Sequence, residues 1–150
     1  MIFIAAEDPL APQSRALIDE SEVFIRTVFR PEACYTYSPE ELANPQSTFF
    51  VAREADQPLG CVALVDMQDY AEIKRLFVPD QCRGKGVARA LMEALEAHAA
   101  ASGHHLIRLE TGEELAAAVI LYRRMGYTEC APFGAYGSGE KSLFMEKRLD

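Results

Sequence analysis

Hydrophobic and polar residues follow two different periods along the first half of the chain, which predicts a mixture of helices and strands. Apolar side chains at helical spacing, with charged residues opposite, predict a helix over about Ser14–Arg30. Ser38-Pro39-Glu40-Glu41 is a capping box with Pro at the first helical position, so a second, short helix begins there. Short apolar runs bounded by turn residues predict strands at Ile2–Ala6, Thr48–Arg53, Leu59–Asp66 and Tyr70–Val78.

The second half of the chain continues this alternation of helices and strands. The predicted elements are a helix from about Val87 to Ser102, a buried strand His105–Glu110, a helix opened by Thr111-Gly112-Glu113-Glu114 and ended by Gly126, and strands Tyr127–Ala131 and Ser142–Arg148. Gly103 supplies the stop of the first of these helices. Thr111 begins a second capping box, so we expect it to cap the last helix.

The most informative stretch is the glycine-rich turn between the strand that ends at Val78 and the helix that begins at Val87. Such a turn aims several backbone N–H groups and the positive end of a helix dipole at one point, which favours phosphate or pyrophosphate binding. Arg83, Lys85 and Arg89 add a local basic cluster. Cations at a helix N-terminus are disfavoured unless an anion binds there, so this cluster also predicts an anion site.

Composition limits the class of protein. A chain of 150 residues that is 49% hydrophobic is typical of one globular domain, and its formal net charge of −8 argues against a dedicated nucleic-acid binder. None of the four cysteines forms a C-x-x-C pair, so no zinc or redox spacing is present. The chain shows neither a signal-peptide pattern nor an apolar run of about eighteen residues. We therefore expect a cytoplasmic protein with reduced thiols and no membrane partner.

The glycine-rich turn, together with Glu72 six residues before Val78, resembles the acetyl-CoA site of the GNAT family of N-acetyltransferases. The predicted order β-α-α-β-β-β-α-β-α-β-β is also that of this family and covers essentially the whole chain. Two registers, starting at Gln81 or at Arg83, fit the family's Gln/Arg-x-x-Gly-x-Gly/Ala pattern. We prefer the Arg83 register, because it gives the family's usual spacing to the next core-facing leucine, Leu91.

The resemblance implies a single domain over residues 1–150 with an α/β fold, a mixed sheet of six to seven strands flanked by four helices. It implies acetyl-CoA as cosubstrate and a splay between the two central parallel strands, Tyr70–Val78 and His105–Glu110, where backbone groups face the pantetheine arm. The implied cofactor-binding residues are Leu76, Phe77, Val78, Arg83, Gly84, Lys85, Gly86, Val87, Ala88 and Arg89. Leu115 stands where many members have an asparagine that contacts the pantetheine.

The resemblance also implies the residues that carry catalysis. Tyr122 begins the family's Tyr-x-x-x-Gly-Phe/Tyr signature, which implies a general acid next to the cofactor sulfur; a core aromatic on the helix's apolar face is the alternative. Glu72 matches the catalytic glutamate of the histone-acetylating branch and would be the general base; an ion pair with Lys74 or Arg75 is the alternative. Glu110, at the edge of the site, is the second candidate for the base.

The acceptor side is less defined by the sequence. Tyr35 and Tyr37 fall where the family usually builds its acceptor pocket, and their rings would shape it or hold a cation; ordinary loop packing is the alternative. We expect an amine of a small molecule, peptide or protein as acceptor, attacked directly in a ternary complex, with no metal. The rival interpretation is a non-enzymatic acyl-CoA-binding regulatory module. A homodimer is compatible with both.

Overall fold

The computed structural model describes residues 1–29, 36–134 and 142–149. The first part of the chain forms β1 (Phe3–Ala6), α1 (Pro12–Val28), α2 (Pro39–Leu42), β2 (Ser47–Glu54), β3 (Gln57–Asp66) and β4 (Ala71–Phe77). A 3₁₀ turn (Asp80–Cys82) leads to α3 (Val87–Ala101), β5 (Leu106–Thr111), α4 (Ala116–Arg124), β6 (Thr128–Glu129) and β7 (Leu143–Arg148). The predicted α/β class, with four α-helices and seven strands among the described residues, is therefore confirmed.

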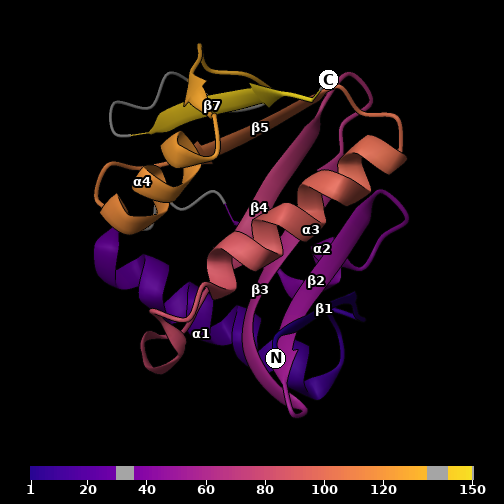
Figure 1. Ribbon diagram of the computed structural model, residues 1–150, viewed down its shortest axis with the longest axis vertical. Coiled ribbons are helices and arrows are strands. Elements are labelled where there is room, and N and C mark those ends of the chain that lie inside the picture. Colours follow the sequence, from indigo (N-terminus) through magenta and orange to yellow (C-terminus); the bar gives the residue numbers. More distant parts are fainter. Residues whose placement is uncertain (30–35, 135–141, 150) are drawn as a thin grey trace.

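The seven strands form one mixed sheet in the order β1-β2-β3-β4-β5-β7-β6 (Figure 1). Neighbouring strands are antiparallel except for β4 and β5, which are parallel and are joined by α3. The helix crosses one face of the sheet to make this connection, as a parallel crossover requires. The two central parallel strands of the prediction are thus β4 and β5.

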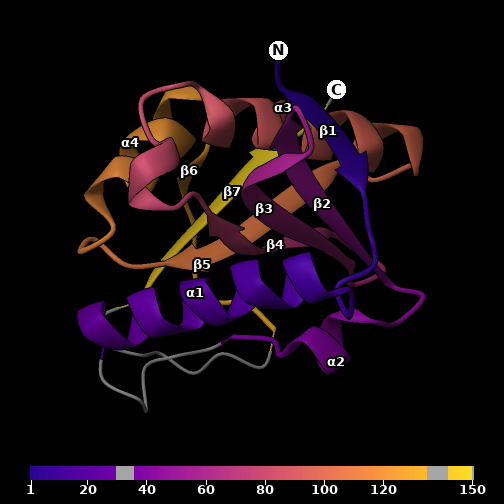
Figure 2. The same ribbon diagram turned by 90° about the horizontal axis from the view of Figure 1, so that it is seen from below.

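Helices cover both faces of the sheet, with α1 and α2 on one side and α3 and α4 on the other (Figure 2). The side-chain alternation of β2 and β3 accounts for this layering. Phe49, Val51, Cys61 and Ala63 belong to the core cluster that packs on α1 and α2. Their sequence neighbours Phe50, Ala52, Val62 and Leu64 belong to the larger cluster under α3. Both faces of these strands are buried, which explains their nearly continuous apolar sequences.

The two predicted capping boxes have opposite outcomes. Ser38 caps α2 as predicted, since its Oγ accepts from the Glu41 N–H at 3.1 Å and the Glu41 carboxylate accepts from the Ser38 N–H at 3.0 Å. The box at Thr111 is wrong, because Thr111 is the last residue of β5 and pairs with Leu143 of β7. α4 begins at Ala116, with Leu115 at the N-cap and no side-chain cap. Pairing with β7 therefore holds Thr111 in the extended conformation.

β4 departs from regular geometry in two ways that position the functional site. Its parallel pairing with β5 runs only from Ala71 to Ile73, after which the strands diverge (Figure 1). Its register with β3 shifts near Arg75, where the backbone φ is +58°. The predicted splay between the central parallel strands is confirmed by this short pairing, which leaves main-chain groups of both strands without a partner in each other.

Candidate functional site

A cavity of about 770 Å³ opens where β4 and β5 diverge. Its walls come from α1, the second half of β4, the glycine-rich turn with the start of α3, the end of β5, and α4 from its first residue to its last. The cavity therefore connects the predicted anion-binding turn with the predicted catalytic residues, although these lie far apart in the sequence. Most of its lining is apolar, with charged side chains at separate places along its length.

The glycine-rich turn forms one end of the cavity and has the geometry of an anion site. Gly84 and Gly86 both have positive φ, +82° and +77°, a conformation that glycine adopts without strain. Gly86 is the N-cap of α3 and offers no side-chain cap, so the first N–H groups of the helix remain available to an anion. Arg83 and Arg89 line the cavity here. The turn thus fits a diphosphate.

All the predicted cofactor-binding residues line the cavity except Lys85. The Lys85 Nζ lies 4.0 Å from a carboxylate oxygen of Glu54 and borders a second, smaller hollow. The Arg83 guanidinium lies 5.5 Å from the ring of Phe24, and its Nε donates to the carbonyl of Val78 at 3.2 Å. Arg83 therefore packs between the end of β4 and α1, while a phosphate contact of the Lys85 side chain stays a prediction.

Tyr122 and Glu110 lie at the cavity's other functional region, on α4 and β5. Burial first, and then the charge of Glu110, raise the pKa of the Tyr122 hydroxyl, so it stays protonated at neutral pH. Burial raises the pKa of Glu110 to about 7, although a hydrogen bond from Ser142 Oγ at 2.8 Å and the nearby charge of Lys74 act in the opposite direction. Glu110 thus titrates near neutral pH.

Glu72 is buried and paired. Its carboxylate lies 3.1 Å from the Nζ of Lys74, and both side chains are less than a tenth exposed. Of the two ion pairs weighed for Glu72, the pair with Lys74 is present, whereas Arg75 pairs with Glu22. Lys74 lines the cavity and Glu72 does not. The role of Glu72 as general base stays a prediction, and the ion pair gives it a structural role as well.

The predicted acceptor residues are only partly described. Tyr35 lies outside the described residues. Tyr37 places its ring 4.8 Å from the Nζ of Lys74, consistent with a ring that holds a cation, but it does not line the cavity. Its neighbour Thr36 does line the cavity.

Several lining residues were missed by sequence reasoning. They are Phe24, Ile25 and Phe29 of α1 and its C-terminal end, Thr36, and Arg124 at the end of α4. The apolar pattern of α1 was visible in the sequence, but an apolar helix face is more often core than cavity wall. Leu115, at the position of the family's asparagine, also lines the cavity. It cannot replace the amide's hydrogen bonds, so that cofactor contact is absent or made by another group.

Comparison with known proteins decides the family. The sequence model described as "Acetyltransferase (GNAT) family" matches residues 15–127. The chain belongs to the GNAT family. A relative named IAA acetyltransferase, from Azospirillum brasilense, is 37% identical over 150 residues, which is 99% of this chain and 98% of the relative. The N-acetyltransferase YsnE of Bacillus subtilis, whose activity is uncharacterized, is 31% identical over 99% of this chain and its own full length.

Solved structures show the same fold for this GNAT protein. An acyl-CoA N-acyltransferase structure from Klebsiella pneumoniae superimposes with a TM-score of 0.84 at 30% identity, covering 100% of this chain and 99% of that one. An aminoglycoside 6'-N-acetyltransferase complexed with coenzyme A superimposes with a TM-score of 0.75 at 18% identity, covering 97% and 96%. Acetyl-CoA is the cosubstrate of the family. Among the described residues, no helix is long and apolar enough to cross a membrane.

Proposed function

We propose that residues 1–150 form one N-acetyltransferase domain that transfers the acetyl group of acetyl-CoA to a primary amine by direct attack in a ternary complex. One observation carries the proposal. A single cavity joins the anion-binding turn at Gly84 and Gly86 to the protonated Tyr122 and the titrating Glu110. A diphosphate at the turn and an acyl group in the β4–β5 opening would bring the thioester to these two side chains.

The chain's own groups would supply binding and proton transfer. Acetyl-CoA supplies the acyl thioester. Main-chain groups of Leu76–Val78, freed by the splay, would hold the pantetheine arm, and the first N–H groups of α3 would hold the diphosphate. Tyr122 would donate its phenolic proton to the departing thiolate sulfur, and its buried hydroxyl is suited to this because it stays protonated. A carboxylate would take the proton from the amine nitrogen.

Of the two carboxylates, Glu110 is the better supported base. It lines the cavity, and its pKa of about 7 is matched to accepting a proton at neutral pH. Glu72 does not line the cavity and is paired with Lys74. We propose that Glu110 accepts the proton, directly or through water. Glu72 would then hold Lys74, whose charge lowers the pKa of Glu110 against the effect of burial.

The experiment that tests the proposal follows the release of free CoA thiol from acetyl-CoA. The amines are spermidine, L-lysine, 2-phenylethylamine and a tripeptide with an N-terminal alanine, and mass spectrometry checks for the acetylated product. We expect at least one amine to stimulate thiol release and to be acetylated. Calorimetric CoA binding without turnover for any amine would favour the rival regulatory module. No CoA binding at near-millimolar concentration would overturn both interpretations.

A further inference from the structure

Arg75 has a backbone conformation that non-glycine residues rarely adopt, with φ at +58°. The register between β3 and β4 shifts here, since Cys61 faces Phe77 while Ala63 faces Lys74. β4 therefore carries one more residue than β3 over this stretch, and we call Arg75–Leu76 the β4 bulge. A left-handed conformation at a residue with a Cβ persists only where surrounding contacts hold it. The contacts of the Arg75 side chain are thus informative.

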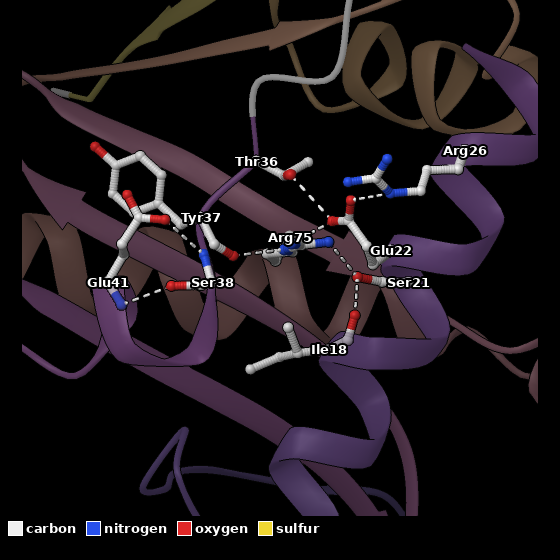
Figure 3. Close-up of polar contacts among 9 residues, drawn as sticks. All are labelled: Ile18, Ser21, Glu22, Arg26, Thr36, Tyr37, Ser38, Glu41 and Arg75. Carbon is white, nitrogen blue, oxygen red and sulfur yellow. Dashed lines mark hydrogen bonds and ion pairs between the residues drawn. The ribbon is translucent and has the colours of Figure 1, made fainter. Parts of the chain in front are cut away.

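The Arg75 guanidinium is buried, with 5% of the side chain exposed, and donates in three directions (Figure 3). Its Nε donates to the carbonyl of Tyr37 at 3.0 Å, one Nη to Ser21 Oγ at 2.8 Å, and the other Nη to a Glu22 carboxylate oxygen at 2.7 Å. Ser21 and Glu22 belong to α1, whereas Tyr37 precedes α2. One planar side chain therefore ties α1 and the segment before α2 to the β4 bulge.

This network reaches the cavity. Three of its residues line it: Ser21, Thr36 and Arg75. The Glu22 carboxylate oxygen that binds Arg75 also accepts from Thr36 Oγ1 at 3.0 Å, so it fixes Thr36 as well. Tyr37, held through its carbonyl, keeps its ring 4.8 Å from the Nζ of Lys74. We call Ser21, Thr36 and Lys74 the acceptor side of the cavity. Arg75 binds Ser21 directly and Thr36 through Glu22. Lys74 precedes Arg75 on β4.

We infer that Arg75 is a positioning residue that holds the acceptor side of the cavity against the β4 bulge. Its three hydrogen bonds set the distance between the main chain of Leu76, which faces the cofactor, and the α1 and Thr36 wall, which faces the amine. The inference rests on the proposed function for its acceptor. Loss of the guanidinium leaves the glycine-rich turn in place and loosens the acceptor side, so amine affinity falls selectively.

Arg75→Gly is the variant that tests this, because glycine favours positive φ and so removes the side chain without penalising the bulge. With acetyl-CoA and the best amine of the four named above, we expect the KM for the amine to rise. The ratio kcat/KM should fall by about a hundredfold, the scale of a misplacement of about 1 Å. The calorimetric Kd for CoA should stay near the wild-type value. Guanidinium chloride at millimolar concentration should restore the amine KM, whereas potassium chloride at equal ionic strength should not.

Arg26→Ala is the matched control. The Arg26 Nε binds the same carboxylate, Glu22, at 2.7 Å, but its side chain is 57% exposed, and Figure 3 shows no hydrogen bond from it to Ser21 or Tyr37. This variant should keep the wild-type amine KM. An unchanged amine KM in Arg75→Gly, or equal losses of CoA and amine affinity, would overturn the inference. If Arg75→Gly does not fold, Arg75→Lys is the second variant. It keeps the charge but loses the planar guanidinium that donates in three directions, and it should show the same selective rise in the amine KM.

Amide hydrogen exchange tests the inference without turnover. CoA binding should slow exchange over residues 36–42 in the wild-type protein, because Arg75 links this segment to the bulge. In Arg75→Gly, CoA should still bind but this protection should be lost. Equal protection in both proteins would overturn the role of Arg75 and leave acetyl transfer untouched. Absence of turnover by the wild-type protein with every amine would instead overturn the proposed function alone.

Discussion

Burial suits Tyr122 and Glu110 to opposite proton-transfer roles, although it raises the pKa of both. The Tyr122 phenol stays protonated at neutral pH, whereas the Glu110 carboxyl, with a pKa of about 7, is partly ionised. A protonated donor and a partly ionised acceptor in one cavity are the pair that amine acetylation needs, the donor for sulfur and the acceptor for nitrogen.

The Tyr122→Phe variant should separate the hydroxyl from the ring. The ring packs 5.8 Å from that of Tyr127 in the main core cluster, so the variant keeps the fold. We expect kcat to fall by roughly a hundred- to ten-thousand-fold, the usual scale of general acid catalysis, with the CoA affinity retained. Steady-state kinetics together with CoA calorimetry measures both. Unchanged turnover would show that Tyr122 is a core aromatic only.

The pH dependence of the reaction should identify the base. The group must be ionised to accept a proton, so kcat/KM should rise with pH through about 7, the pKa of Glu110, and then level off. Glu110→Gln should lower kcat/KM most near neutral pH. The deficit should shrink toward the pKa of the amine, about 10 for a lysine-like acceptor, since the free amine then needs no base. Glu72→Gln, run alongside, should keep the shape of the wild-type profile, with the rise moved to lower pH because the charge of Glu72 raises the pKa of Glu110. A loss confined to neutral pH in Glu72→Gln, together with a wild-type profile in Glu110→Gln, would make Glu72 the base.

For single residues, the sequence identified the candidate catalytic side chains but not the ion pairs that they form. The Tyr122 signature and the glutamates were visible as motifs. Whether Glu72 pairs with Lys74 or with Arg75 depends on the β4 bulge, since the left-handed conformation of Arg75 turns its side chain toward Ser21 and Glu22. No hydrophobic period marks such a bulge, because it arises from register with a neighbouring strand.

Elements specified by short-range interactions were predicted well, and those specified by distant partners were not. The glycine-rich turn and α3, like the capping box of α2, depend on residues a few positions apart. The start of α4 depends on whether Thr111 pairs with β7, more than thirty residues later in the chain. The strand predicted at Tyr127–Ala131 is reduced to Thr128–Glu129, because regular pairing with β7 covers only these two of the described residues. Beyond them, a single backbone hydrogen bond continues to β7, from the Cys130 N–H to the Phe144 carbonyl at 2.8 Å.

Gly60 of β3 lies close to residues that line the cavity, and the sequence did not reveal this close approach. A Cβ there would lie 2.8 Å from the Phe77 carbonyl oxygen and 3.3 Å from Val87. We expect Gly60→Ala to push β4 away from β3, to lower the free energy of unfolding by about 1–3 kcal/mol and to weaken CoA binding. Thermal unfolding and calorimetry measure the two effects.

Gly103→Ala is the control for the Gly60 variant. Its φ of +88° makes alanine strained, but nothing lies within 4 Å of the added Cβ, and Gly103 does not line the cavity. It should therefore lose about 1 kcal/mol of stability with an unchanged CoA affinity. Equal CoA affinities in the two variants would show that the close contact between β3 and β4 does not shape the cofactor site.

Across the whole molecule, the basic cluster at the glycine-rich turn lies in a chain of net charge −8. CoA at about 100 times its Kd should stabilise the native state by about 2.7 kcal/mol, a rise in Tm of roughly 5 to 10 °C. Reversing Arg83 and Arg89 together to Glu should weaken CoA binding and reduce this rise. Reversing Arg123 and Arg148, which are exposed and do not line the cavity, changes the net charge equally and should not. Equal losses would attribute the effect to overall charge.

The short pairing between β4 and β5 also has a consequence for protein engineering. One wall of the cavity comes from residues before Ser102 and the other from residues after Gly103. In the part of the chain that the structure describes, the sheet joins these two parts through three residue pairs between β4 and β5. The Ser102-Gly103 turn is exposed. A chain divided there would yield two fragments whose shared surface includes the acetyl-CoA site. The ligand would contact both fragments, so their association would report the concentration of acetyl-CoA.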